Sequence, residues 1–497
     1  MAEEINDLIK QRISKLEALK GMGLEPYGRA FPDLLSIKEL IKQDTEDRGH
    51  LPAGKAGRTE KESTVAGRLM AIRLHGKSAF CDIKDQTGKV QIYIKEDIIG
   101  KDKFAIFEKL DIGDIVGVRG EIFKTRTGEL TIKVVELTIL SKSLRPLPEK
   151  WHGLKDVETR YRQRYVDLIV NDEVKNIFYT RSKIISKIRQ FLDERGYLEV
   201  ETPMMHSIAG GAAGKPFKTH HEALDMDLYL RIAPELYLKK LLVGGFEKVY
   251  EINRSFRNEG ISIKHNPEFT MLEVYTAYSD CAGTMRLTEE LIHFAAREVL
   301  GKEELEYQGQ KIDLTKWERV SFADLMKENF DIRPEDDTKA WVEKLKKKNI
   351  QLEKGAVSRT QVLNIIADLI EPKAKAHPVF VVDIFTELCP LAKTKKENPL
   401  LTDRFELFMG GMEVANAYSE LNDPIEQRKR FEEQIEPANR QTGKPANQID
   451  EDFLRALEYG MPPAGGLGIG IDRLVMVLTN SASIRDVILF PQLRPED

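Results

Sequence analysis

The chain has 497 residues, too many for a single hydrophobic core, so two or three domains are expected. Hydrophobic residues make up 41% and charged residues 32% of the chain, which excludes a disordered or fibrous protein. The net charge of −5 excludes a general attraction to nucleic acid, so any such affinity has to come from a local patch.

The cysteines and the N-terminal sequence indicate the compartment. The three cysteines lie far apart without a CxxC pair, which suits a reducing environment and excludes a zinc site made from them alone. The stretch MAEEINDLIKQRISKLEALK is charged throughout and lacks the apolar core of a signal peptide. No apolar run approaches the roughly 20 residues that cross a bilayer, so we expect a cytoplasmic protein without a membrane span.

The first part of the chain predicts a helix followed by a small barrel. Apolar residues recur at helical spacing over 4–20 and the next stretch has no clear period, so 1–63 is expected to be an N-terminal helical extension. Between Val65 and Leu140 five short β-like runs are separated by turns such as DQTGK and KTRTGE. This pattern favours a five-stranded Greek-key barrel of the oligonucleotide-binding type (OB-fold) over 64–144, with a small β-sandwich as the alternative.

A basic segment follows the predicted barrel. Residues 145–165 are expected to be a linker that two nearby prolines stiffen. Over 141–165 the chain has seven basic residues against three acidic ones. The segment therefore either meets phosphates or is a solvated hinge with incidental charge.

The remaining chain, 166–497, predicts an α+β domain. A helical pattern runs from Val174 to Tyr197, and a short strand then ends at Pro203. Helical runs alternate with charged stretches over about 280–378, which we interpret as a helical insertion. Strands return after it, followed by a helix and a glycine-rich segment near the C-terminus.

Two strand-like runs frame the segment FRNEGISIKHNPEF, and their alternation predicts a functional sheet face. The residues that share one face of these runs are Glu251, Asn253, Ser255 and Arg257 before the loop, and Phe269, Met271, Glu273 and Tyr275 after it. Paired around the loop, the runs would align an arginine, an aromatic ring and a carboxylate. Arginine suits phosphate or carboxylate, a ring can stack on a base, and a buried glutamate requires a cation. A surface ladder is the alternative.

Three segments resemble the motifs of the class II aminoacyl-tRNA synthetases. KVYEINRSFRNEG through TMLEVY (about 249–275) resembles motif 2, a hairpin with phe-Arg-x-glu at its core. LDERGYLEVETP (about 185–203) resembles motif 1, a helix and strand at a dimer interface, and GGLGIGIDRLVMVLTN (about 465–480) resembles motif 3. With a barrel ahead of them and with GGAAGKPFKTHH and SELND also matching, the similarity is closest to the lysyl-tRNA synthetases and covers nearly the whole chain.

The resemblance implies an ATP site with two catalytic arginines. Arg257 would hold the α-phosphate of ATP and the carboxylate of the amino acid, and Phe269 would stack under adenine. Arg473, at the positive end of its helix, would bind the γ-phosphate. The residues that would border the adenosine and the pyrophosphate are Glu259, His265 and Asn266.

The resemblance also implies an amino-acid pocket with an acidic floor. Its residues would be Gly211, Glu235, Arg257, Glu273, Tyr275, Asn416, Tyr418 and Glu420. Glu235 and the carbonyl of Gly211 would take the α-ammonium. Glu273 and Glu420 would neutralise a side-chain ammonium, whereas a carboxylate side chain would need a basic residue there. Tyr418 departs from the family, which often has phenylalanine at that position.

Glu413 and Glu420 resemble the family's Mg²⁺ ligands, and carboxylate oxygens suit this ion. The two residues are seven positions apart, so an ideal strand would place them on opposite faces. A bulge, a strong twist or a bridging water is therefore required. The alternative is one ligand and one surface glutamate.

On the barrel, the resemblance implies a surface that reads the anticodon of a tRNA. Phe80 would stack on a base, and the residues that would read uridines are Arg73, Gln91 and Glu136, with His75 as a further candidate. These five residues could equally be ordinary strand residues on a barrel face.

Together these features predict an enzyme that uses ATP to convert L-lysine to lysyl-adenylate and transfers it to the 3′ end of tRNA(Lys), as a homodimer joined through motif 1. Three alternatives are an aspartyl- or asparaginyl-type synthetase, a paralogue that transfers lysine to a protein, and an inactive tRNA-binding protein. The acidic pocket disfavours the first, the barrel the second, and the intact Arg257 and Arg473 the third.

Overall fold

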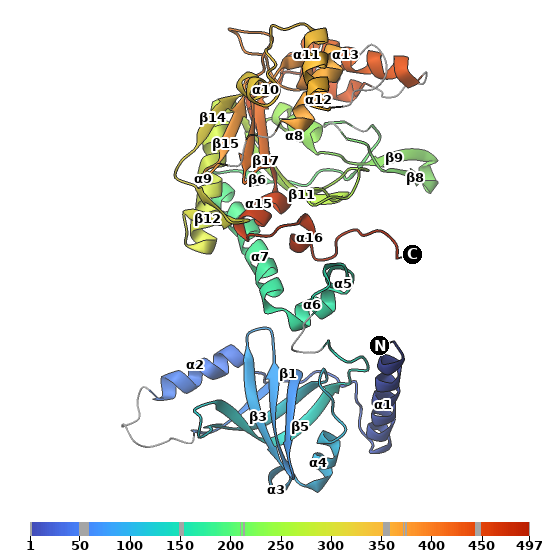
Figure 1. Ribbon diagram of the computed structural model, residues 1–497, viewed down its shortest axis with the longest axis vertical. Coiled ribbons are helices and arrows are strands. Elements are labelled where there is room, and N and C mark those ends of the chain that lie inside the picture. Colours follow the sequence, from blue (N-terminus) through green and yellow to red (C-terminus); the bar gives the residue numbers. More distant parts are fainter. Residues whose placement is uncertain are drawn as a thin grey trace. The chain divides into compact units, whose positions relative to one another are not determined.

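The computed structural model describes residues 2–48, 59–148, 154–208, 210–211, 214–350, 358–370, 372, 375–442 and 449–496. The chain forms two compact units, residues 1–155 and 156–497 (Figure 1). Within the described ranges, no helix is both long enough and apolar enough to cross a bilayer.

The first unit is built on a closed five-stranded barrel with the strand order β1-β2-β3-β5-β4. The strands are β1 (Thr59–His75), β2 (Ser78–Lys84), β3 (Lys89–Lys95), β4 (Ile115–Lys124) and β5 (Leu130–Ser141). Two short helices, α3 (Glu96–Ile99) and α4 (Lys101–Phe107), connect β3 to β4. Alternate strand residues such as Ile83, Ile92 and Val134 fill the interior. The predicted OB-type barrel is confirmed, and the sandwich is excluded.

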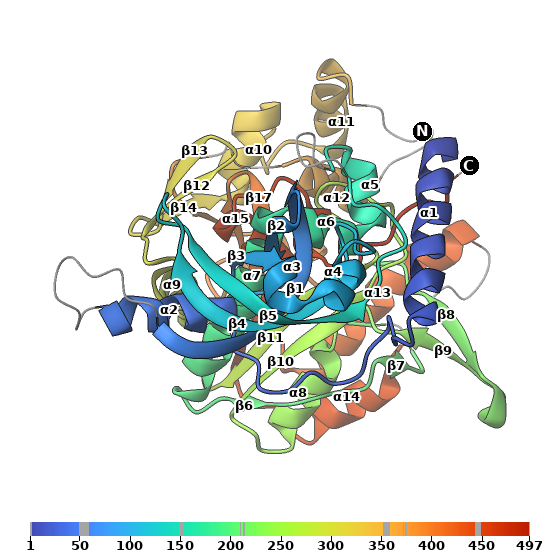
Figure 2. The ribbon, with the colours of Figure 1, turned by 90° about the horizontal axis from the view of Figure 1, so that it is seen from below.

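Two further helices belong to this unit, α1 (Ala2–Gly21) and α2 (Ile37–Arg48), and they lie on opposite sides of the barrel (Figures 1 and 2). Strand β1 begins at Thr59, so the predicted boundary at 63/64 falls inside a strand. Residues 59–63, the end of the predicted extension, therefore belong to the first strand of the barrel.

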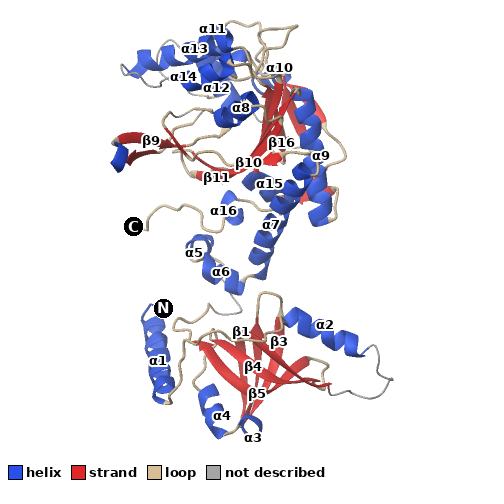
Figure 3. Cartoon of the chain, turned by 180° about the vertical axis from the view of Figure 1, so that it is seen from behind, coloured by secondary structure: helices blue, strands red, loops and turns tan. Residues whose placement is uncertain are grey.

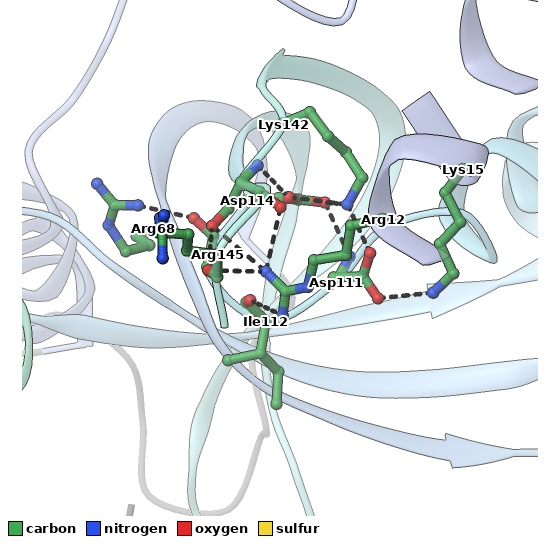
Figure 4. A network of polar contacts seen from close by, with 10 residues as sticks. Arg12, Lys15, Arg68, Asp111, Ile112, Asp114, Lys142 and Arg145 are labelled. Carbon is green, nitrogen blue, oxygen red and sulfur yellow. Dashed lines mark hydrogen bonds and ion pairs between the residues drawn. The ribbon is translucent and has the colours of Figure 1, made fainter. Parts of the chain in front are cut away.

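Helix α1 is fastened to the barrel by buried polar contacts (Figure 4). The Arg12 guanidinium donates to the carbonyl oxygens of Ile112, Ser143 and Arg145 at 3.0–3.1 Å. The side chain of Lys142 is fully buried, and its ammonium lies 2.6 Å from Asp111 and 3.0 Å from Asp114. Because Arg12 of α1 satisfies these three backbone carbonyls, α1 is an integral part of this unit.

The second unit is built on an eight-stranded sheet with the order β14-β15-β16-β17-β18-β11-β10-β6. Its strands are β6 (Leu198–Glu199), β10 (Lys248–Phe256), β11 (Glu268–Ala277), β14 (Glu318–Ser321), β15 (Val379–Val382), β16 (Arg404–Met409), β17 (Met412–Ser419) and β18 (Ala464–Gly470). Neighbours pair antiparallel except β14 with β15 and β10 with β6. This sheet and its helices confirm the predicted α+β class.

Helices α7 (Asp172–Asp193), α9 (Cys281–Leu300) and α15 (Ile471–Leu478) share the main core of this unit with the sheet. The small strands are β7 (Met205–His206), β8 (Lys218–His221), β9 (Met226–Leu230), β12 (Glu304–Tyr307) and β13 (Gln310–Asp313). The β8–β9 hairpin extends away from the large sheet (Figure 3). The other helical segments are α5 (Val157–Arg162), α6 (Arg164–Val170), α8 (Glu235–Val243), α16 (Ile484–Val487), η1 (Glu222–Leu224) and η2 (Thr386–Leu388).

A second group of helices, α10 (Phe322–Phe330), α11 (Thr338–Lys347), α12 (Arg359–Leu369), α13 (Pro424–Thr442) and α14 (Glu451–Glu458), gathers at one end of the sheet (Figure 3). Helices α10 to α12 pack around the buried Trp341.

The structure narrows the predicted insertion of 280–378, because α9 lies in the main core and β14 joins the large sheet. The charged stretches between α9 and β14 made both elements look like part of an insertion in the sequence. The predicted linker is helical from Val157, and its residues 149–153 lie outside the described part of the chain.

Candidate active site

The hairpin of β10 and β11 carries the residues that the sequence placed on one face. Glu251 lies opposite Glu273, Asn253 opposite Met271, and Ser255 opposite Phe269. Directly opposed residues of an antiparallel pair point to the same side of a sheet, so the predicted pairing is confirmed. Glu251 is not available to a ligand, because its carboxylate is buried 2.7 Å from the Arg231 guanidinium.

Strand β18 explains why this part of the sequence is rich in glycine. It lies between β11 and β17, and the residues opposite its glycines are Tyr275 and Tyr418 across from Gly466, and Glu273 and Asn416 across from Gly468. A Cβ atom on Gly466 would come within 1.9 Å of Glu420 Oε1 and 2.7 Å of a Tyr275 ring atom. The missing side chains therefore leave room for a pocket above the middle of the sheet.

A cavity of about 190 Å³ lies above this hairpin and the start of α15. The residues predicted to bind ATP all line it: Arg257, Glu259, His265, Asn266, Phe269 and Arg473. Glu413 and Asn416 of β17 line it as well. The structure thus brings Arg257 and Arg473, which are 216 positions apart in the chain, into one cavity.

Arg257 is placed to meet an anion. Its guanidinium lies 5.1 Å from the centre of the Phe269 ring, and its Nε is buried without a hydrogen-bond partner among the described residues. Burial lowers the pKa of Arg257, and the carboxylates of Glu259 and Glu413 oppose this shift. A buried donor without a partner is costly, so a phosphate or carboxylate in this cavity would be stabilised. Gly214 packs against this arginine, and a Cβ there would lie 3.2 Å from Arg257 Cδ.

Arg473 joins three segments at the other end of the cavity. Its Nη1 donates to the Glu413 carbonyl at 2.9 Å and lies 3.2 Å from the Glu413 carboxylate, and its Nη2 contacts His265 Nε2 at 3.1 Å. Burial and the Arg473 charge lower the pKa of His265, which favours the neutral imidazole. Since Nε2 then accepts from Arg473, Nδ1 carries the proton and donates to Ser262 Oγ, 2.9 Å away.

Three carboxylates, those of Glu235, Glu273 and Glu420, are buried and interact electrostatically with one another, and Arg257 acts on Glu273 as well. We refer to this cluster as the acidic pocket. Tyr418 donates its hydroxyl hydrogen to Glu235 Oε1 at 2.6 Å, and Tyr275 donates to Glu273 Oε2 at 3.0 Å. Gly211 adjoins this pocket, since a Cβ on it would lie 3.4 Å from Glu235 Cβ. The hydroxyl of Tyr418, which a phenylalanine at this position would lack, thus has Glu235 as its hydrogen-bond partner.

The pKa of Glu273 is strongly raised. Burial and the nearby Glu235 raise the pKa of Glu273 to about 8, against the opposing effects of the Tyr275 hydroxyl and the Arg257 charge. Glu251 makes a smaller contribution in the raising direction. A carboxyl group in this state ionises readily only when a cation arrives beside it.

The sequence reasoning missed Lys239, which lies in the middle of the acidic pocket. Its fully buried ammonium is 2.7 Å from Glu235 Oε1 and 2.5 Å from Glu420 Oε2. Burial works against its charge, but the two carboxylates together raise the pKa of Lys239. The spacing of four residues from Glu235 on a helix was the available signal, because such residues share a face.

Strand β17 contains a bulge, one of the three features that the sequence required for Glu413 and Glu420 to share a metal. Leu407 pairs with Ala415 but Phe408 pairs with Glu413, so Val414 is the extra residue of a β-bulge. Because of this extra residue, Glu413 lies on the same face of β17 as Asn416 and Tyr418.

No cluster of three His, Cys, Asp or Glu side chains suited to a metal occurs among the described residues. Glu420 Oε1 is buried and has no hydrogen-bond partner in the described part of the chain. Two carboxylates suit Mg²⁺, which usually retains water and substrate phosphates as its other ligands.

On the barrel, the predicted anticodon residues lie on neighbouring strands. Arg73 pairs with Phe80 across β1 and β2, and the Arg73 guanidinium lies 2.7 Å from the Asp82 carboxylate. Gln91 is largely buried and accepts a hydrogen bond from Thr131 at 2.9 Å. The Glu136 carboxylate lies 2.6 Å from Arg119.

Two aromatic residues that the sequence reasoning missed extend the surface around Phe80. The ring of Tyr93 lies 4.8 Å from that of Phe80, and the ring of Phe123 lies 6.3 Å from that of Tyr93. His75 approaches Phe80 edge-on at 6.4 Å. The signal for Tyr93 was its position two residues after Gln91, on the same strand face.

Comparison with known proteins agrees with this geometry. The family described as tRNA synthetases class II (D, K and N) matches residues 156–494, and the family described as OB-fold nucleic acid binding domain matches residues 63–140. A protein of Carboxydothermus hydrogenoformans named "Lysine--tRNA ligase" is 55% identical over 100% of this chain and 99% of its own length. The Bacillus subtilis protein of the same name is 49% identical over 99% of this chain and 98% of its own length. The chain therefore belongs to the class II tRNA synthetase family, with an OB-fold domain preceding the catalytic one.

Proposed function

We propose that this protein is a lysine–tRNA ligase: it activates L-lysine with ATP and transfers the lysyl group to the 3′ end of tRNA(Lys). The observation that carries the proposal is the acidic pocket beside Arg257, in which three carboxylates are buried with one lysine. A buried excess of negative charge requires a cationic ligand. The names of the relatives, which match the chain at full length, support lysine as that ligand.

The activation step needs no nucleophile from the protein. Glu235 and the Gly211 carbonyl would hold the α-ammonium of lysine, and Glu273 and Glu420 the ε-ammonium. The carboxylate, held by Arg257, would attack the α-phosphorus, and the bond to pyrophosphate would break with its electron pair on the leaving oxygen. Alignment and charge stabilisation by Arg257 and Arg473 account for catalysis.

The remaining residues of the pocket would hold the nucleotide and the metal. Phe269 would stack on adenine, with Glu259, His265 and Asn266 around the adenosine and pyrophosphate. Glu413 and Glu420 would hold Mg²⁺, which when bound supplies positive charge to the phosphates. Tyr275, Asn416 and Tyr418 would line the lysine side chain.

In the transfer step, the terminal ribose 3′-hydroxyl of tRNA(Lys) would attack the carbonyl carbon of lysyl-adenylate, and AMP would leave. The barrel would bind the anticodon through Phe80, Arg73, Gln91 and Glu136. The enzyme would act in the cytoplasm, where protein synthesis takes place. Exposed aromatic rings suit unpaired bases, which stack on them.

The proposed enzyme acts as a homodimer joined through motif 1. A groove of about 770 Å³ runs along α7, and residues such as Phe178, Ile185, Val487 and Leu489 line it. Leu489 is a large apolar side chain of this groove and is 44% exposed. A second copy would cover this surface, and sedimentation equilibrium would give twice the mass of one chain.

ATP–pyrophosphate exchange with each amino acid in turn tests the proposed function. Lysine is expected to stimulate exchange far more than aspartate, asparagine or arginine, because only a side-chain ammonium satisfies the acidic floor. Exchange driven by aspartate would instead support the aspartyl-type alternative. Charging of a protein acceptor in place of tRNA would support the lysine-transferring paralogue.

A further inference from the structure

Lys239 is a buried, charged side chain of the acidic pocket to which the proposed mechanism gives no role. Helix α8 begins at Glu235, and Lys239 follows one turn later on the same face. Its side chain is 0% exposed, and the rings of Tyr418 and Phe453 lie 5.6 and 5.9 Å from its ammonium. The ammonium has no access to solvent, so it is a fixed part of the pocket.

The charges of the pocket match the proposed substrate only if Lys239 is counted. With a ligand bound and all three carboxylates ionised, Glu235, Glu273 and Glu420 contribute three negative charges, and Lys239 contributes one positive charge, which leaves two. L-Lysine brings two ammonium groups, and its carboxylate is assigned to Arg257. Without Lys239, two ammonium groups would face three buried carboxylates.

Lys239 also directs the oxygens that a ligand can use. Both Lys239 and Tyr418 contact Oε1 of Glu235, so neither of these donors uses Oε2. On Glu420 the ammonium contacts Oε2, and Oε1 has no hydrogen-bond partner in the described ranges. The Lys239 ammonium thus pairs with one oxygen of each of two carboxylates, and it makes no contact with the other oxygen of each.

We propose that Lys239 is a positioning and specificity residue, a permanent counterion that sets the pocket to accept a ligand with two ammonium groups. This inference rests on the proposed function, since it concerns the binding of lysine. It assigns Lys239 no contact with the substrate. Its effect passes through Glu235 and Glu420, which it holds in place and partly neutralises.

The test compares Lys239→Met with Lys240→Met in the full-length protein by ATP–pyrophosphate exchange. Lys240 is the matched control, because it is adjacent on α8 but its ammonium binds the exposed Asp452 at 2.7 Å. Lys239→Met is expected to raise the KM for lysine about tenfold or more, as expected for lost hydrogen bonds to charged groups, and to leave the KM for ATP nearly unchanged. Lys240→Met should resemble the wild type.

A double variant separates charge balance from packing. In a Glu235→Gln background one carboxylate is already neutral, so Lys239→Met should change the KM for lysine by no more than about twofold. Equal costs in both backgrounds would mean that Lys239 only fills space, and would overturn the inference. If Lys239→Met alone does not fold, the comparison of Glu235→Gln with the double variant decides by the same criterion.

The outcomes distinguish the inference from the function on which it rests. Wild-type protein without lysine-dependent exchange would refute the proposed function. Wild-type exchange with lysine, together with a Lys239→Met variant that matches Lys240→Met, would refute only the role of Lys239. A rise in both KM values would also refute it, because a general distortion does not single out lysine.

Discussion

The barrel surface and the active-site pocket both combine aromatic rings with charged side chains, but they neutralise their charges differently. On the barrel, Arg73 is paired with Asp82 and Arg119 with Glu136, and most of these groups are exposed. In the pocket, three carboxylates share one lysine, and Arg257 has a buried donor without a partner among the described residues.

The difference indicates what each region can bind. A surface whose charges are already paired offers mainly ring faces and hydrogen-bonding edges, which suits neutral bases of a single strand. A buried site with an unbalanced charge is stabilised only by a ligand of opposite charge. The comparison therefore predicts that substitutions in the two regions affect different steps of the reaction.

The largest effect is expected for Arg257→Ala, which tests the role proposed for the active site in exchange. Loss of the group that meets the developing charge should lower kcat/KM for ATP–pyrophosphate exchange by about 10²–10³-fold. Arg297→Ala is the control, because that arginine is 59% exposed on α9. An Arg257→Ala variant with normal exchange would remove this residue from the mechanism.

Glu273→Gln should have the next largest effect and should act on the amino acid alone. Removing one partner of a buried charge pair is expected to raise the KM for lysine about 100-fold, with a much smaller change in the KM for ATP. Measurement of exchange at varied lysine and varied ATP separates the two constants. Equal changes in both would show that the pocket is not dedicated to the amino acid.

The raised pKa of Glu273 predicts a pH dependence. In the empty pocket this carboxyl group holds its proton below about pH 8, and lysine binds the ionised form. The KM for lysine should therefore fall roughly tenfold between pH 6.5 and pH 8 as the proton is lost, and binding at pH 7 should release a proton. Calorimetry in buffers of different ionisation enthalpy measures that release, and the Glu273→Gln variant should reduce it, because burial raises the pKa of Glu420 to about 8 as well.

The smallest effect is expected on the barrel. Phe80→Ala should raise the KM for tRNA in the charging reaction about fivefold, because one base loses its stacking partner. Exchange without tRNA should be unchanged. Leu74→Ala, an exposed strand residue close to the aromatic surface, is the control. Equal loss of exchange and charging in Phe80→Ala would contradict the separation of the two regions.

The sequence predicted those features that follow from local alternation and motif spacing. The barrel strands and the pairing of Glu251 with Glu273 both result from a period of two along extended chain. The composition of the pocket could be predicted only in part. Lys239 was missed because its partner Glu420 is 181 positions away, and its contact with that residue depends on how α8 packs against the sheet.

Two other differences have physical reasons as well. The predicted insertion was too long because α9 and β14 carry charged residues on one side while their other side packs into the main unit. The bulge at Val414 could be inferred only as a requirement, because no residue type there specifies an extra position in the strand. Such features depend on tertiary contacts more than on local propensity.

The attachment of α1 to the barrel affects how this unit could be studied alone. Arg12 covers three backbone carbonyls, and Lys15 lies 2.6 Å from Asp111, beside the buried Lys142. A fragment that starts at the first strand would expose these groups to solvent and lose the helix that shields them. Recombinant versions of this OB-fold unit should therefore retain the first helix.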